Sequence, residues 1–124
     1  MHAAKGDTPP AALLGEFVDD YDTRYRISAK EFVEGRSVYQ VLEWRPKEQY
    51  FLARNADTNR TDGGKFSRFD WVMLPDQGAY AWGYCHSAWK APTVDSARAT
   101  LVVDRAVPRV GCNRNPFTRM KKGI

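Results

Sequence analysis

Large apolar residues alternate with polar ones at a period of two across most of this chain, and this pattern restricts the fold more than any other feature. The alternation runs from Gly15 to Ala88 in short stretches rich in Val, Ile, Leu, Tyr, Phe and Trp. Successive side chains of a β-strand point to opposite faces, so this period predicts strands. We expect strands at residues 15–21, 24–28, 30–33, 37–44, 48–55, 64–74 and 79–88.

The connections between these stretches are short and rich in turn formers such as Asp, Gly and Pro, apart from a longer loop at residues 56–63. Strands joined by such turns must be antiparallel neighbours. A meander of this kind leaves two exposed edges unless it closes on itself. We therefore expect a mainly β fold in which an antiparallel meander closes into a small barrel, with a β-sandwich as the alternative.

A different pattern follows the last of these strands. Thr93 can cap a helix, and Val94, Ala97 and Leu101 recur at helical spacing, which predicts one short helix at about residues 93–104. Prolines and glycines interrupt the rest, which predicts an extended C-terminal tail. A chain of 124 residues and 14.1 kDa is the size of one domain. We expect that domain at residues 13–124, after a flexible lead at residues 1–12.

The opening stretch Gly15-Glu16-Phe17, followed by a meander and a late helix, resembles the start of the lipocalin-like, or calycin-like, small barrels. The usual lipocalin opening has Trp where this chain has Phe17. The resemblance is one of architecture, and it implies a barrel that holds a small ligand.

Aromatic residues are abundant, with four Trp, six Tyr and six Phe. In the stretch 79–88, alternation places Tyr80, Trp82, Tyr84 and His86 on one face and small residues on the other. We expect these side chains, together with Trp44 and with Arg68 as a polar anchor, to bind a small apolar or aromatic ligand. The alternative is core packing plus an ion pair between Arg68 and Asp70, which share a face.

His86 is the only histidine in the body of the chain and hence the natural candidate for proton transfer near neutral pH. A small nuclease that uses His86 with an acid and an arginine is therefore one hypothesis, and a hydrogen-bonded histidine at a strand end is the other.

The sequence contains none of the familiar hydrolase, nucleotide-binding or zinc-protease motifs. The oxygen-rich stretch 57–64 fails the register of a calcium loop. We expect no catalytic residue, no cofactor and no metal.

Cys85 and Cys112 are the two cysteines, and a single disulfide between them is the simplest prediction. Two free buried thiols are the alternative, and zinc is disfavoured because short-spaced Cys and His are lacking. A disulfide implies an oxidising compartment, so we expect a secreted or periplasmic protein. The first residues contain no apolar stretch of signal length, which suggests a mature form after removal of a signal peptide.

The net charge is +4, and most of the basic excess lies in the C-terminal tail, whereas the aromatic residues lie in the strands. This separation disfavours a nucleic-acid stacking groove. No apolar run approaches the length of a membrane span.

The leading hypothesis is a non-enzymatic binding protein for a small apolar or aromatic ligand. The alternative is a protein-interaction or inhibitor module that uses loop 56–63 and the basic tail.

Overall fold

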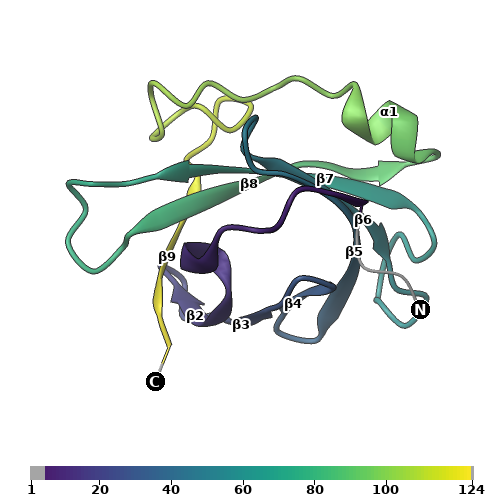
Figure 1. Cartoon of the computed structure of the whole chain (residues 1–124), viewed down its shortest axis with the longest axis horizontal. Coiled ribbons are helices and arrows are strands. Elements are labelled where there is room, and N and C mark those ends of the chain that lie inside the picture. Colours follow the sequence, from purple (N-terminus) through teal and green to yellow (C-terminus); the bar gives the residue numbers. More distant parts are fainter. Residues whose placement is uncertain (1–4, 124) are drawn as a thin grey trace.

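The computed structural model describes residues 5–123 and contains a closed antiparallel β-barrel (Figure 1). Each strand pairs with the next one along the chain, and the last strand returns to pair with the first, which closes the barrel. The strands of the barrel are β2 (Gly15–Asp19), β3 (Arg24–Ile27), β4 (Glu31–Glu34), β5 (Ser37–Arg45), β6 (Tyr50–Asn55), β7 (Phe66–Met73), β8 (Trp82–Ala91) and β9 (Thr118–Lys122).

The closed meander confirms the expected mainly β barrel, and the sandwich alternative is wrong. Strands β2 to β8 match the seven expected stretches, with ends displaced by up to three residues. Strand β9 was not expected, because it lies in the segment interpreted as an extended tail. It carries one deeply buried apolar residue, Met120, among basic ones, so its alternation is too short to predict a strand.

The helix α1 (Val94–Arg98) begins as expected but is shorter than residues 93–104. Thr93 accepts a hydrogen bond from the Ser96 backbone and forms a capping box with Ser96. After Arg98 the chain turns away, and Val103 instead pairs with Cys112 in an isolated β-bridge. Leu101 therefore lies outside the helix despite its helical spacing, because the pairing of Val103 with Cys112 holds this segment in an extended conformation.

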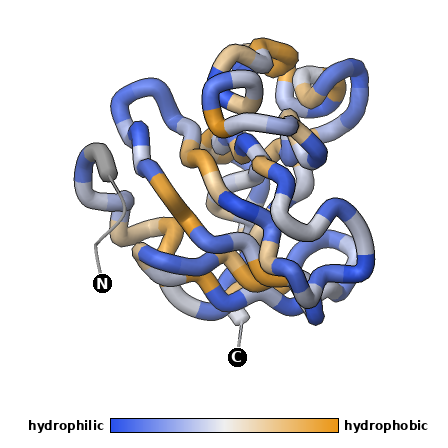
Figure 2. The backbone as a smooth tube through the Cα atoms, turned by 90° about the vertical axis from the view of Figure 1, so that its right-hand side faces the viewer, coloured by the Kyte–Doolittle hydropathy of each residue, from blue (hydrophilic) through white to orange (hydrophobic). Residues whose placement is uncertain are grey.

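The barrel interior is filled with side chains, most of them aromatic. Every barrel strand contributes to one buried cluster, and the short 3₁₀ helix η1 (Ala11–Leu13) adds Leu13. The rings of Phe51 and Phe69 stack with centroids 4.8 Å apart, and Phe32 lies 4.7 Å from Phe69. Burial of this apolar surface is the main contribution to folding. Figure 2 shows hydrophobic stretches, in orange, interrupted by hydrophilic ones, in blue, along the backbone.

A second layer covers the outside of β7 and β8. The segment from α1 to the start of β9 crosses that face, as Figure 1 shows. It buries Phe117 and Ala97 against the barrel in two smaller apolar clusters. Gly83 makes this approach possible, because a Cβ atom there would lie 3.0 Å from the Thr118 carbonyl oxygen. Most residues of β7 are buried on both faces, because this segment covers the outer one.

Part of the expected lead contacts the barrel. Strand β1 (Lys5–Gly6) pairs in parallel with Glu43 and Trp44 of β5, beyond the end of β4. Leu13 of η1 is only 1% exposed. Residues 1–4 of the lead lie outside the described residues. Within the described range, no helix is long and apolar enough to cross a membrane.

Candidate functional site

One end of the barrel is open because its strands differ in length. Strand β8 has ten residues, but β9 pairs only with its first three, Trp82 to Tyr84. The second half of β8, including His86, therefore overhangs that edge of the barrel. The β2–β3 turn, the β4–β5 turn and the β6–β7 loop meet at this end, because alternate connections of an up-and-down barrel share one end. We call this opening the mouth pocket.

The mouth pocket has a volume of about 370 Å³, within the range of small-molecule sites. Its lining combines aromatic, hydroxyl, amide and acidic side chains from the β2–β3 turn, the β6–β7 loop and strands β4, β5, β6 and β8. These residues are Thr23, Glu34, Ser37, Tyr39, Asn55, Thr61, Asp62, His86 and Trp89.

A chain of hydrogen bonds fixes His86 at the floor of the mouth pocket. The Asn55 amide donates to the backbone carbonyls of Asp62 and Trp89, which orients its oxygen toward Ser67. The Ser67 hydroxyl donates to that oxygen at 2.6 Å, and its own oxygen lies 2.8 Å from His86 Nε2. Because the single Ser67 proton is already used, His86 must carry its proton on Nε2. The imidazole is thereby held in one tautomer and one orientation.

The surroundings of His86 keep the imidazole neutral. Its ring stacks on Phe69 with centroids 4.1 Å apart, and burial lowers the pKa of His86 to about 3. Its side-chain hydrogen bond goes to Ser67, and no acid or arginine in residues 5–123 hydrogen-bonds to it. The arrangement that the nuclease hypothesis requires is therefore not present among the described residues. The neutral, stacked imidazole thus forms part of the floor of the mouth pocket.

Glu34 points into the mouth pocket from the end of β4. Phe32, two residues earlier on the same face, is fully buried in the barrel. Gly35, with a φ of 58°, allows the tight turn that follows and keeps Glu34 at the rim. Burial, and then the nearby Asp19 carboxylate, raise the pKa of Glu34. Ionisation of the Glu34 carboxyl group is therefore costly.

A buried polar triad of Asp19, Tyr25 and Tyr84 lies near Glu34 in the barrel interior. The Tyr25 hydroxyl donates to Asp19 at 2.6 Å and lies 2.7 Å from the Tyr84 hydroxyl. Burial is the main reason why the pKa values of both tyrosines are raised, so both stay protonated and neutral. Asp19 in turn accepts two backbone hydrogen bonds from the β2–β3 turn. This network fixes the turn that supplies Thr23 to the pocket.

The structure brings four of the expected ligand residues to the barrel interior and leaves two outside. Trp44, Trp82 and Tyr84 belong to the packed cluster, and His86 lies beside them at the mouth pocket. The Trp44 indole donates to the Ala29 carbonyl, whereas the buried indole N–H of Trp82 has no acceptor among the described residues.

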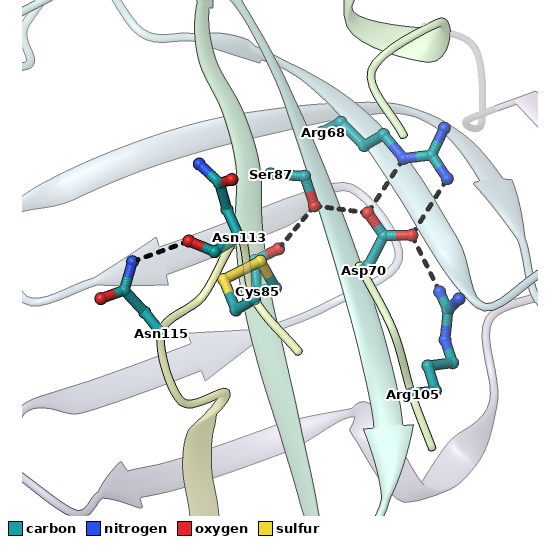
Figure 3. Close-up of a disulfide and its surroundings, with 8 residues drawn as sticks. Arg68, Asp70, Cys85, Ser87, Arg105, Asn113 and Asn115 are labelled. Carbon is teal, nitrogen blue, oxygen red and sulfur yellow. Dashed lines mark hydrogen bonds and ion pairs between the residues drawn. A yellow bond between two sulfur atoms is a disulfide. The ribbon is translucent and has the colours of Figure 1, made fainter. Parts of the chain in front are cut away.

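Arg68 lies on the outer face of β7, under the C-terminal segment. It forms the expected ion pair with Asp70, with two hydrogen bonds of 2.9 and 3.0 Å. Asp70 also accepts from Ser87 and from Arg105 (Figure 3). Arg68 is thus a structural residue, and the barrel wall separates it from the interior.

Tyr80 lies outside the barrel, because β8 begins two residues later, at Trp82. The guanidinium of Arg119 lies 4.7 Å from its ring centroid, and the Lys121 ammonium lies 5.5 Å away. Tyr80 therefore does not share the inward face of Trp82, because the strand does not extend back to Tyr80.

The expected disulfide is present and joins Cys85 to Cys112. It ties the small-residue face of β8 to the C-terminal segment, as Figure 3 shows. The alternatives of two free thiols and of zinc ligation by these cysteines are therefore wrong.

Sequence reasoning missed most of the mouth pocket. Of its lining residues only His86 was expected, because the others lie in connections or near the ends of four different strands, and no periodicity marks their shared position. The overhang of β8 could not be expected either, because the short strand beside it, β9, was itself not expected.

Another groove lies on the opposite side of the β2–β3 turn. It has a volume of about 530 Å³ and includes Tyr21, Arg109 and Arg119. Tyr21 is 76% exposed, and Arg119 is paired with Asp20. This groove lies against the basic tail, where the interaction hypothesis places a partner, and that hypothesis stays a prediction.

No group of three or more His, Cys, Asp or Glu side chains that could hold a metal ion occurs in the part of the chain that the structure describes. Comparison of the chain with known protein families, with curated proteins and with solved structures finds no match.

Proposed function

We propose that this protein is a non-enzymatic binding protein that holds a small ligand in the mouth pocket of a lipocalin-like barrel. The single observation that carries the proposal is the overhang of β8, which leaves a pocket of about 370 Å³ above a barrel filled by its own side chains. The ligand site thus lies at the open end, above the interior positions of Trp44, Trp82 and Tyr84.

Two features support binding over catalysis. His86 is held neutral and bonded to a fully buried serine, so it is a poor proton donor or acceptor at neutral pH. Trp89 at the rim is 48% exposed, although it is a large aromatic residue next to a concave site. Exposed aromatic side chains beside a pocket are typical of ligand contacts.

The Cys85–Cys112 disulfide supports a secreted or periplasmic location, because such bonds persist mainly in oxidising compartments. A binding protein of this kind would meet its ligand outside the cytoplasm.

Native mass spectrometry of the protein purified from its natural source tests the proposal. We expect a complex heavier than the polypeptide by one small molecule, which denaturation releases. The variant Thr61→Trp, which places an indole at the pocket lining, should appear at the bare polypeptide mass. The matched control Thr58→Trp changes an exposed residue of the same loop and should retain the ligand. A wild-type protein without ligand, whose melting temperature no small-molecule extract raises, would contradict the proposal.

A further inference from the structure

We propose that the ligand of the mouth pocket is a small organic amine bound as its cation, an inference that rests on the binding function proposed above. The first observation is charge. The pocket lining contains two carboxylates, Glu34 and Asp62, and no lysine or arginine. The chain as a whole carries 19 basic against 15 acidic residues, so the pocket has the opposite sign to the protein. Such a site attracts cations and repels anions.

The second observation is that neither carboxylate forms an ion pair with a lysine or arginine of the described residues. Five of the other acidic side chains pair with arginines: Asp20, Glu43, Asp57, Asp70 and Asp95. Among the ion pairs described for residues 5–123, none includes Glu34 or Asp62. Glu34 nevertheless points into a partly desolvated site, where a carboxylate is costly without a counter-charge. A cationic ligand would supply that charge.

The third observation is the set of aromatic walls. The rings of Tyr39 and His86 lie 5.3 Å apart at 84°, and those of His86 and Trp89 lie 6.3 Å apart at 69°. Nearly perpendicular rings present both faces and edges to a guest, and the face of an aromatic ring attracts an ammonium group. Because His86 stays neutral, it does not repel the cation.

An organic cation fits this pocket better than a metal ion. The Nε2 atom of His86 is committed to Ser67, and the residues that the structure describes contain no cluster of three metal-ligating side chains. The aromatic walls offer contact area to a carbon skeleton, which a bare ion would leave unused. The volume of about 370 Å³ suits a molecule of about one ring and a short chain.

Isothermal titration calorimetry at pH 8 with three matched probes tests the inference. The probes share one ring and differ in charge: 2-phenylethylamine, 2-phenylethanol and 3-phenylpropionate. We expect the amine to bind at least about tenfold more tightly than the alcohol, and the carboxylate to give no measurable heat. Glu34→Gln should weaken amine binding by about tenfold and leave alcohol binding unchanged. The matched control Glu31→Gln removes the same charge from the exposed, outward face of β4 and should bind the amine like the wild type.

A second pair of variants guards against a folding defect in Glu34→Gln. Asp62→Asn should also weaken amine binding, and Asn tolerates the positive φ of 58° at this position. Asp57→Asn, in the same loop but outside the pocket lining, is its control. Equal affinity for the amine and the alcohol, unaffected by either pocket variant, would overturn the amine inference but leave the binding function standing. Binding of none of the probes would also overturn it, and the native mass spectrum would then decide the binding function separately.

Discussion

The guanidinium of Arg105 donates a hydrogen bond to Oδ1 of Asp70 at 2.8 Å, so the C-terminal segment contacts a carboxylate buried in the middle of β7. The same carboxylate accepts from Arg68 and from the Ser87 hydroxyl (Figure 3). Arg105 also donates to the Trp71 and Gln49 carbonyls. The outer layer is thus attached to the barrel by a charged network as well as by apolar contacts.

Replacement of Asp70 by Asn should destabilise the protein strongly. Asp70 is 1% exposed, and its loss would leave Arg68 buried without a counter-charge. Removal of one partner of a buried pair costs about 3–5 kcal/mol. Urea denaturation measures this free energy. The control Asp57→Asn breaks an exposed pair with Arg54 and should cost less than about 1 kcal/mol. Similar losses for both variants would contradict the structural role of Asp70.

Removal of the disulfide should lower stability without changing the barrel. Cys85 and Cys112 are 27 residues apart, and closing a loop of this length stabilises by about 3–4 kcal/mol in the chain-entropy model. The double variant Cys85→Ala with Cys112→Ala should therefore unfold at lower urea concentration. Reductant should reproduce the effect in the wild type and have no effect on the variant. Hydrogen exchange should rise mainly in residues 99–117, and equal increases across β5 and β6 would argue against a local role.

His86 should make the folded state less stable as the pH falls. Its pKa is about 3 in the folded protein and about 6.5 in an unfolded chain, so between these values the unfolded state binds more protons. The destabilisation of the folded state by His86 is absent above pH 6.5 and increases as the pH falls to about 3. Denaturation of the wild type and of His86→Gln at pH 7 and pH 4 measures it. The variant should lose less stability over this interval, and an unchanged difference would contradict the buried, neutral imidazole.

Glu34 should have the opposite effect. Its folded pKa is raised, so the folded state binds the proton more readily than the unfolded state and stability decreases as the pH rises above about 4.5. At a pH where Glu34 is ionised in both the folded and the unfolded state, the folded state is destabilised by the full cost of burying the carboxylate. Glu34→Gln should thus be more stable than the wild type at pH 7, while the two are alike at pH 4. A less stable variant at pH 7 would show that the carboxylate already has a stabilising partner.

The strands and the barrel could be predicted because their signals are local. Alternation of residues such as Phe17, Phe32 and Phe69 depends only on the strand period, and short turns force antiparallel neighbours. The disulfide followed from the presence of only two cysteines. The Arg68–Asp70 pair followed from two residues that share a face.

The order of β2 to β8, the disulfide and the inward face of β8 thus follow from local patterns and from the number of cysteines. The closure of the barrel by β9, the positions of Arg68 outside the barrel and Glu34 in its mouth, and the neutral state of His86 do not. These properties depend on which strand overhangs its neighbour and on which face the C-terminal segment covers. Both are set by contacts between residues far apart in the chain, such as Asp70 with Arg105, and no local period encodes them.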